Sequence, residues 1–437
     1  MQTTDISAAA VAASLTAAGS GRGVCILDSC GVGRAGTNHQ IAGIDPVEVV
    51  ELTGGEPELT LKRLNELLNA DSRAAVFTLS YDLGRQLIGL PQDPPQRTQE
   101  PTAYVALYDT LLVHDYDEGV TAQIGNTPDK APAEILSESG NAQPPRPTPA
   151  PFVSNFSRSE YIAAVEEIKE LICRGETYQT NLTQQIKVPL VGGDDAGKVF
   201  LRLRGSNPAP FAAYIDRGRS AAVSASPEEF IHITHSADGR QITASPIKGT
   251  RPRGRTAAED ARLRDELLSS GKDRAENTMI VDLMRNDLGR ICKFGSVTVG
   301  DLCRLEEHPT LYHLVSTVTG TLRDDVSYSD ILRAIFPCGS ITGAPKIRTM
   351  EIIDRLEPDS RGLSMGAVGC RIPAGWLGAE VFEMSVAIRT MVISDRTAVF
   401  NVGGGIVIDS DPQVEYEESM LKAKALLTAL GAAPGSG

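Results

Sequence analysis

A single lysine, Lys248, follows a proline and precedes a glycine in the segment Ala244–Gly254 (ASPIKGTRPRG). A lysine amine attacks carbon only after it loses its proton. Its ordinary pKa of about 10.4 must therefore fall by roughly three units for such chemistry near neutrality. Burial or neighbouring cations supply a shift of this size. Because Arg251, Arg253 and Arg255 follow, the segment predicts either a positioned nucleophile or an inert, solvated basic turn.

A carboxylate on a predicted helix, 272–288, offers a second kind of chemistry. Glu276 shares the apolar stripe of this helix, and a buried charge without a partner is costly. A salt bridge to Arg274 or Arg285 is one way to satisfy it, and a metal ion is the other.

The last predicted helix, 414–430, repeats the arrangement with Glu415, Glu418 and Lys422 at positions i, i+3 and i+7. Such a stripe is commonly solvated and held by a Glu–Lys pair four residues apart. Two helices that each present carboxylates beside apolar positions also suit Mg²⁺, a hard cation that takes a few carboxylates and keeps water ligands. The sequence leaves both interpretations open.

Glycine-rich stretches predict two backbone sites. In Pro337–Lys346 (PCGSITGAPK), glycines precede a helix, and Ser340 and Thr342 add hydroxyl groups. This pattern favours a seat for a carboxylate or phosphate over a plain helix–helix turn. The triplet Gly403-Gly404-Gly405 lies between two predicted strands and indicates close backbone approach by another group.

Two further features concern polar side chains. The strand predicted over 177–191 has a polar face with Gln179, Asn181 and Thr183. A polar strand face is usually solvated, but glycine-rich turns recur nearby, which favours a cleft. His313 lies in a segment of ambiguous periodicity, 311–318. A lone histidine of this kind is more often a satisfied core residue than a functional one.

Apolar spacing and turn residues predict the elements that must position these groups. Helices are expected in 1–20 (a weak alanine helix), 59–68, from the capping box Ser157-x-x-Glu160 to Gly175, 272–288, 346–356 (preceded by a helix capped at Ser327-x-x-Asp330) and 414–430. Strands are expected at 24–27, 74–80, 102–114, 177–191, 211–215, 230–234, 241–244, 398–402 and 406–408, with a tight turn at 224–229. Lys248 then occupies a turn after the strand 241–244.

Composition excludes several classes of protein. The formal net charge of −14 argues against a nucleic-acid binder, and 41% hydrophobic with 22% charged residues is typical of a soluble globular protein. Seven cysteines without a CxxC pair predict neither a disulfide framework nor a zinc site, which favours reduced thiols in a cytoplasm. No apolar run approaches 18 residues, and no signal peptide is recognisable, so we expect no membrane association.

A composition break at 126–151, ending in QPPRPTPAP, predicts an exposed, extended linker. It separates an N-terminal portion, 1–125, from a catalytic portion, 152–437. Strands can return across such a linker, so independent folding does not follow. The patterns together predict an enzyme with a magnesium-assisted site for a small anion and leave its reaction open.

From about residue 157 to 430 the chain resembles the chorismate-utilising enzymes. The family's motifs occur in order as SPEEF, PIKGTRPRG, AENTMIVDLMRNDLGRI, LYHLVSTVTGTL, FPCGSITGAPKIRTMEIID, AIRTM and GGGIVIDSDPQVEYEESMLKAKAL. The resemblance implies an α/β (α+β) fold of two large, mostly antiparallel sheets packed together with flanking helices. Weaker likenesses, LDSCG (27–31) and LSYDLGR (79–85), imply that the N-terminal portion contributes strands to this shared body. LDSCG also corresponds to a tryptophan or inhibitor site of relatives, a possible regulatory site.

Position 248 separates branches of this family. Members that make anthranilate resemble this chain but carry alanine there, whereas lysine is similar to the branch that forms aminodeoxychorismate. Isochorismate-forming members place a lysine base where this chain has Gln179, which counts against water addition. The resemblance thus implies amination of chorismate at C4 to 4-amino-4-deoxychorismate, the precursor of 4-aminobenzoate and folate. The alternatives are anthranilate formation and a non-catalytic chorismate-binding partner.

The resemblance also implies residue roles. Lys248 attacks C2 of the ring as the C4 hydroxyl leaves, Glu228 of SPEEF protonates that hydroxyl, and His313 contacts the departing side. Mg²⁺ is held by Glu276 and Glu418, with Glu415 acting through water. Substrate-binding residues are expected to be Thr342, Gln179, Arg389, Gly403, Gly404, Gly405 and Lys422.

The chain departs from the family pattern on one side of the pocket. The family's Gly-Tyr pair becomes Gly369-Cys370, and its GNMDT segment becomes Ala379–Met384 (AEVFEM) with extra residues upstream. No glutamine amidotransferase sequence is present. Glutamine-dependent activity would therefore require a separate amidotransferase subunit, a heterodimeric partner that supplies ammonia.

Overall fold

The computed structural model describes most of the 437-residue chain. The described residues are 2–18, 21–33, 38–69, 72–90, 100–126, 144–236, 239–307 and 311–434. Most of the predicted linker, 127–143, lies outside these ranges.

The larger of two main sheets has 13 strands within the described residues. In spatial order they are β1 (Gln2–Thr4), β8 (Val120–Gly125), β7 (Thr110–Asp115), β3 (His39–Gly43), β2 (Cys25–Asp28), β11 (Phe211–Asp216), β12 (Ser220–Ser226), β23 (Thr390–Ser394), β24 (Thr397–Ile406), β10 (Gln179–Pro189), β9 (Ala150–Ser154) and β25 (Ala432–Pro434), with β20 (Gly343–Ala344) also paired to β10. All its described pairs are antiparallel except β25 with β9.

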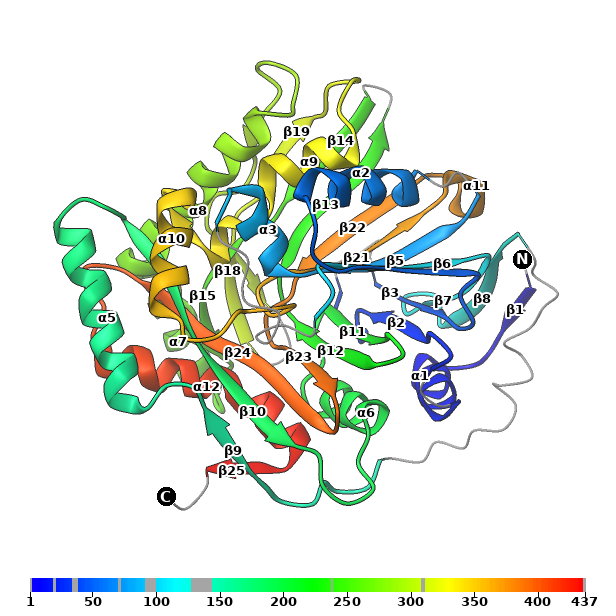
Figure 1. Cartoon of the computed structure of the whole chain (residues 1–437), viewed down its shortest axis with the longest axis horizontal. Helices are drawn as coiled ribbons and strands as arrows, with labels where there is room; N and C mark the ends of the chain where they lie inside the picture. Colours follow the sequence, from blue (N-terminus) through cyan, green and yellow to red (C-terminus); the bar gives the residue numbers. More distant parts are fainter. Residues whose placement is uncertain are drawn as a thin grey trace.

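The second sheet has nine strands in the same described ranges, all paired antiparallel. Their order is β16 (Thr298–Val299), β19 (Val318–Thr321), β14 (Gly239–Ala244), β13 (Glu229–Ser236), β22 (Val381–Val386), β21 (Ala367–Ile372), β5 (Ala74–Leu79), β6 (Ala103–Tyr108) and β4 (Glu48–Leu52). Strands from before residue 126 therefore pair directly with strands from beyond residue 152 in both sheets. Figure 1 shows the blue β5 beside the orange β21.

Helices cover the outer faces of the two sheets. They are α1 (Ala8–Ala17), α2 (Pro57–Leu68), α3 (Tyr81–Leu87), α5 (Arg158–Cys173), α6 (Ala196–Ser206), α7 (Ala257–Ser269), α8 (Gly271–Gly289), α9 (Tyr328–Ile335), the 3-10 turn η1 (Gly339–Ile341), α10 (Lys346–Leu356), α11 (Ala374–Leu377) and α12 (Pro412–Leu430). Apolar side chains of α2, α8 and α9 pack on the nine-stranded sheet, and those of α1, α6 and α12 pack on the larger one. A third core lies between the sheets, so the layers run helices, sheet, sheet, helices. The expected fold class is confirmed.

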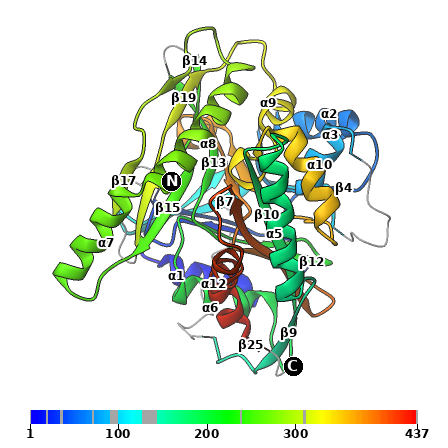
Figure 2. The same ribbon diagram turned by 90° about the vertical axis from the view of Figure 1, so that its left-hand side faces the viewer.

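A small third sheet carries Lys248. It consists of β15 (Ile247–Pro252), β18 (Leu311–Val315) and β17 (Arg304–Glu307), and it packs with α7 around Leu267, Tyr312 and Leu314. Figure 2 shows this sheet and α7 projecting from the main body at the left. The base of the projection faces α8.

Most predicted elements occur close to their expected bounds. The helix 346–356 coincides with α10, and both capping boxes form, at Ser157 with Glu160 and at Ser327 with Asp330. Helix α7, for which we made no prediction, is almost entirely exposed, with Leu267 its one buried residue. Its apolar pattern is correspondingly weak.

Four predictions about strands were wrong. The segment 102–114 forms two strands, β6 and β7, with the break at Asp109, and β12 continues through Ser226 where a turn was expected at 224–229. The glycine triplet does not separate two strands, because β24 runs through all three glycines in register with β10. Lys248 lies in strand β15 and not in a turn. In each case a neighbouring strand supplies the backbone partners that local sequence does not reveal.

None of the described helices is both long and apolar enough to cross a lipid bilayer.

Candidate active site

A β-bulge aims the Lys248 side chain. Ile247 pairs with Val315 and Thr250 with His313, so β15 has one residue more than β18 between the two pairs. The extra residue falls at Lys248-Gly249. Gly249 has φ of +82°, and a Cβ there would lie 2.9 Å from Leu267 Cδ1, so glycine is required both by conformation and by space. Bulges of this kind redirect side chains beside active sites.

The Lys248 amine points toward the turn η1. Its Nζ donates a hydrogen bond to the carbonyl oxygen of Ser340 at 3.4 Å. The lysine is partly buried, so it is not the fully solvated basic residue of the alternative interpretation. Arg251 and Arg253 instead form ion pairs with acidic residues of α7 and α8, Glu266, Asp273 and Asp260.

Glu228 lies in the short link between β12 and β13, close to the lysine. It is 5% exposed, and its Oε1 has no hydrogen-bond partner among the described residues. Burial raises the pKa of the carboxyl, and the nearby Lys248 ammonium opposes that rise. A carboxyl with a raised pKa holds a proton at higher pH than usual, as a general acid must.

Arg389 brings a second cation to Glu228. Its backbone has φ of +49°, a left-handed conformation that is strained for arginine. Burial lowers the pKa of the guanidinium, and the Glu228 carboxylate opposes that change. Within the described part of the chain no carboxylate lies at ion-pair distance from Arg389. A half-buried cation without a carboxylate partner suits an anionic ligand.

Glu276 of α8 and Glu415 of α12 face one shared cation, Lys272. The Lys272 Nζ lies 4.0 Å from Glu276 Oε1 and 3.7 Å from Glu415 Oε1. Glu415 is 4% exposed and accepts a hydrogen bond from Ser410 Oγ at 2.7 Å. Burial raises the pKa of Glu276, opposed by Lys248 and Lys272. The expected partners Arg274 and Arg285 form no ion pair with Glu276 in the described structure.

Glu418 and Lys422 form the predicted pair four residues apart on α12. Their charged atoms are 2.8 Å apart, and Lys422 Nζ also donates to the carbonyl oxygen of Gly403 at 2.9 Å. Burial would raise the pKa of Glu418, but the ammonium groups of Lys422, Lys272 and Lys248 together outweigh burial and lower that pKa, with Lys422 contributing most among them. Lys248 thus lies within electrostatic range of Glu228, Glu276 and Glu418.

The glycine strand forms one wall of this site. A Cβ on Gly404 would lie 3.1 Å from Glu415 Oε2 and 3.5 Å from Lys422 Nζ, so its face is turned toward α12. A Cβ on Gly405 would meet Gln179 Nε2 at 2.1 Å. The Gln179 side chain is fully buried, and neither its Nε2 nor its Oε1 has a hydrogen-bond partner among the described residues. Buried amides without partners are costly, so Gln179 indicates a polar ligand.

Thr342 and His313 make internal hydrogen bonds. The Thr342 hydroxyl donates to the carbonyl oxygen of Cys338 at 3.1 Å, and it keeps acceptor capacity only. His313 is 4% exposed, and its Nδ1 lies 2.9 Å from Thr250 Oγ1, two residues beyond Lys248. Thr342 therefore stabilises η1, and His313 faces the same strand as the lysine.

The carboxylates fit a divalent cation only in part. Among the described residues, no three or more His, Cys, Asp or Glu side chains are close enough together to hold a metal ion by themselves. Glu276 and Glu415 nevertheless share one positive group, as two ligands of a cation would. Mg²⁺ is commonly bound through one or two carboxylates and keeps the rest of its shell for water and substrate oxygens. The donor set fits this mode of binding.

The relationship to known proteins follows from three comparisons. Residues 25–428 match the family described as chorismate binding enzyme. The chain belongs to this family. It is 36% identical to aminodeoxychorismate synthase component 1 of Escherichia coli over 88% of this chain and 83% of that protein. It is 38% identical to an anthranilate synthase component 1 of Haloarcula marismortui over 83% of this chain and 76% of that protein.

Solved structures agree with this family assignment. Anthranilate synthase component I from Streptococcus pneumoniae superposes with a TM-score of 0.74 at 27% identity, covering 89% of this chain and 92% of that one. The protein is therefore a chorismate-utilising enzyme of this family. Sequence identity does not separate its aminodeoxychorismate-forming members from its anthranilate-forming ones, because both match at similar levels.

The two departures from the family pattern lie in the sheets. Cys370 is 1% exposed in the core between the two sheets, next to Val76 of β5 and Glu383 of β22 in register. The residues just upstream of Ala379–Met384 form the short helix α11 (Ala374–Leu377). Glu383, opposite His232 of β13, has a pKa raised to about 7 by burial and by Glu229.

The LDSCG segment, compared above with an inhibitor site of the family, is internally satisfied at Asp28. Its carboxylate accepts hydrogen bonds from Arg204, Gln40 and Tyr116, all between 2.6 and 2.7 Å. Whether the segment binds a regulatory ligand stays a prediction.

Several residues of the site were not predicted. Lys272 precedes Glu276 by four residues, a spacing that signals an ion pair on a helix. Glu357 and Arg361, just after α10, hydrogen-bond to β10, and Arg361 also bonds to η1. Their neighbours in the sequence are Pro358 and a turn, so no local pattern predicts these contacts.

Proposed function

We propose that this enzyme is component I of aminodeoxychorismate synthase, which aminates chorismate at C4 to give 4-amino-4-deoxychorismate. The product is a precursor of 4-aminobenzoate and folate, and we expect the reaction in the cytoplasm. Curated relatives named aminodeoxychorismate synthase component 1, from Escherichia coli and Bacillus subtilis, support this activity. A separate glutamine amidotransferase subunit would supply the ammonia.

The observation that carries the proposal is the position of Lys248. Its amine is held by a bulge, bonds to the Ser340 carbonyl oxygen at 3.4 Å and acts electrostatically on Glu228 and on two glutamates of α8 and α12. Alanine at this position, as in members that make anthranilate, would leave no nucleophile. A poised amine is therefore expected to change which ring carbon receives nitrogen.

The chain's own residues supply a two-step substitution. The neutral Lys248 amine forms a bond to C2 of the ring, the double bonds shift, and the C4–oxygen bond breaks as Glu228 gives its proton to the departing hydroxyl, which leaves as water. Ammonia then bonds to C4, the double bonds shift back, and the C2–nitrogen bond breaks to release Lys248. The proton lost by the new amine returns to Glu228.

Binding groups orient the diacid for these steps. Lys422, Arg389 and the backbone of Gly403–Gly405 would bind its carboxylates, together with Gln179 and Thr342. Glu276, Glu418 and Glu415 would hold Mg²⁺, which when bound neutralises the ring carboxylate and withdraws electron density from the ring. His313, whose Nδ1 lies 2.9 Å from Thr250 Oγ1, would contact the side of the departing hydroxyl.

A coupled assay tests the proposed activity. Purified protein receives chorismate, Mg²⁺ and ammonium, with and without a lyase that converts aminodeoxychorismate to 4-aminobenzoate. We expect 4-aminobenzoate only when the lyase is present, and its loss in Lys248→Ala. Fluorescent anthranilate formed directly would instead identify an anthranilate synthase, and chorismate binding without turnover would identify a non-catalytic partner.

The same assay tests the source of ammonia. Glutamine in place of ammonium is expected to support turnover only after a glutamine amidotransferase subunit is added. Turnover of glutamine by this chain alone would contradict the proposed division between two subunits.

A further inference from the structure

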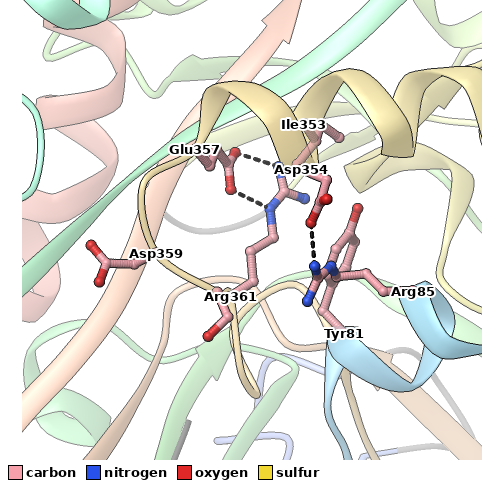
Figure 3. Close-up of a pocket in the computed structure, with 8 residues that line it drawn as sticks. Tyr81, Arg85, Ile353, Asp354, Glu357, Asp359 and Arg361 are labelled. Atoms are coloured by element: carbon pink, nitrogen blue, oxygen red, sulfur yellow. Dashed lines mark hydrogen bonds and ion pairs between the residues drawn. The ribbon is translucent and has the colours of Figure 1, made fainter. Parts of the chain in front are cut away.

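An ion pair between Arg361 and Glu357 is buried at the end of α10. The two side chains are 1% and 3% exposed, and two hydrogen bonds of 2.9 and 2.7 Å join the guanidinium to the carboxylate. The guanidinium also stacks over Tyr81, 4.6 Å from the ring centre. Figure 3 shows Arg361 extending between Glu357 and Tyr81.

The remaining donors of Arg361 hold two walls of the candidate active site. One nitrogen donates to the carbonyl oxygen of Ile341 at 2.9 Å, and another donates to that of Asn181 at 2.7 Å. Ile341 directly follows Ser340, whose carbonyl oxygen accepts the Lys248 hydrogen bond. Asn181 is paired with Gly405 in the adjoining strand. One guanidinium therefore ties the lysine's acceptor segment to the glycine wall.

Glu357 binds the same strand two residues further on. Its Oε1 accepts hydrogen bonds from the backbone nitrogen of Thr183 at 2.7 Å and from its hydroxyl at 2.9 Å. Thr183 is paired with Gly403, whose carbonyl oxygen accepts from Lys422. The ion pair thus contacts β10 opposite both ends of the glycine triplet.

The pair fills a gap along one edge of β10. On that edge β20 pairs with residues 179–180 and β9 with residues 186–187, and the atoms held by the ion pair lie between them. Arg361 donates to a strand carbonyl and Glu357 accepts from a strand amide, as a neighbouring strand would. Polar side chains here replace a missing length of strand.

A small cavity, open to solvent, lies beside the pair. It is lined also by Arg85, Asp354 and Ser360. Burying two charges costs desolvation free energy, and a protein in which apolar residues of similar volume replace such a pair is often equally stable. A gain in fold stability is therefore a poor explanation for this pair, and its contacts with the site walls offer a better one.

We propose that Arg361 and Glu357 are positioning residues that set β10 and η1 relative to Lys248, so that the glycine wall and the lysine meet one substrate. The identity of the substrate in this inference rests on the proposed function, whereas the contacts of the two residues come from the structure. It assigns no contact with the reacting atoms to either residue.

The test is a double variant, Arg361→Met with Glu357→Leu, which replaces both charged side chains by apolar ones. The replacement leaves no unpaired charge, but it also leaves the carbonyl oxygens of Ile341 and Asn181 and the amide of Thr183 without these partners, so we expect the thermal midpoint to fall by some degrees while the protein stays folded. We expect kcat for 4-amino-4-deoxychorismate formation from ammonium to fall at least about tenfold, since small misplacements of reacting groups are costly. Arg361→Lys keeps the charge but cannot reach both carbonyl oxygens, and should also lower kcat.

Asp354→Asn provides the matched control. Asp354 lies on the same helix, lines the same cavity and pairs with Arg85 of α3, and the Asp354 carboxylate itself makes no bond to β10 or η1 within the described residues. We expect it to leave kcat within twofold of wild type. An equal loss in Asp354→Asn would show that docking of α10 in general matters, and would overturn the proposal.

Two readouts need no turnover and so separate this inference from the proposed function. Hydrogen exchange of peptides covering 179–186 and 339–344 should accelerate in the double variant, and the acylation rate of Lys248 by an amine-reactive reagent should change. If the wild type made no 4-amino-4-deoxychorismate but the double variant still showed these changes in exchange and acylation, the proposed function would be contradicted and the positioning role would not. If the double variant had the same hydrogen exchange, acylation rate and kcat as the wild type, the positioning role would be overturned.

Discussion

The Lys272 ammonium lies 3.7 Å from Glu415 Oε1, although the two residues belong to different helices and are 143 positions apart. It lies 4.0 Å from Glu276 Oε1 on its own helix. Two carboxylates that would repel each other are thus held together by one flexible, half-exposed cation. Lys272 occupies the position between these carboxylates that the proposed Mg²⁺ would take, so we expect the two cations to compete.

Removing Lys272 should strengthen binding of divalent cations. In Lys272→Met, we expect the affinity for Mg²⁺ or Mn²⁺ in the absence of substrate to rise about fivefold, close to 1 kcal/mol, the scale of a partly exposed ion pair. Isothermal titration calorimetry measures this directly. Lys293→Met is the control, because Lys293 pairs with the exposed Asp324 at 3.3 Å. Unchanged or weaker cation binding in Lys272→Met would argue against competition.

The bulge at Gly249 should tolerate no side chain. Gly249→Ala places a Cβ 2.9 Å from Leu267 Cδ1 and 3.0 Å from Asp273 Cβ at a positive φ, so we expect a loss of about 1–3 kcal/mol in unfolding free energy. Urea denaturation measures that loss, and the coupled assay should show a fall in kcat as Lys248 is displaced. Gly271→Ala meets open space at the start of α8 and should leave both quantities near wild type.

Stability should depend on pH through Glu383. Burial and Glu229 raise its pKa from 4.5 to about 7, so the folded protein binds this proton more tightly than the unfolded chain does. The stability that the protonated Glu383 carboxyl contributes to folding is therefore fully present below about pH 4.5 and is lost as the pH rises toward 7. Glu383→Gln stays neutral, and relative to wild type it should gain on the order of 2 kcal/mol between pH 5 and pH 8. Thermal unfolding of both proteins at pH 5 and pH 8 measures this difference. Equal stability of Glu383→Gln and wild type at both pH values would contradict the prediction.

Lys422 should matter for binding more than for folding. Its amine joins the Gly403 carbonyl oxygen and Glu418 at the proposed carboxylate subsite, while its side chain is 37% exposed. In Lys422→Met we expect the KM for chorismate to rise about tenfold, the cost of one charge-assisted contact, with little change in thermal midpoint. Lys62→Met, on an exposed face of α2, is the control. A fall in kcat at constant KM would instead point to a role in the chemical step.

Local sequence predicted the elements whose signals are local. The helix 346–356 and both capping boxes depend on side chains within four residues of each other, and they occur as expected. Strand ends at 102–114 and the course of the chain through the glycine triplet depend on partners far along the chain, and those predictions were wrong. The pairing of Gly403 with Thr183 is an example, because 220 residues separate the two.

The same division holds for the candidate site. Lys248, Glu228 and the glutamates were chosen from residue type and motif, and the structure gathers Lys248, Glu228, Glu276 and Glu418 within one electrostatic environment. Lys272 bridging two helices and Arg361 bridging β10 and η1 were missed. Each makes its bonds to backbone or carboxylate atoms that only packing brings near.

The sequence by itself determined which chemical groups this protein can use: one amine in a fixed motif, an acid, several carboxylates and a run of glycines. Only the tertiary structure decided that Lys248 lies on a bulged strand facing Ser340, and that a buried ion pair stands in for a strand beside Asn181. The reason is physical. Residue types and short-range spacing are fixed along the chain, whereas burial, strand register and the sharing of one cation by two helices arise from contacts between distant segments.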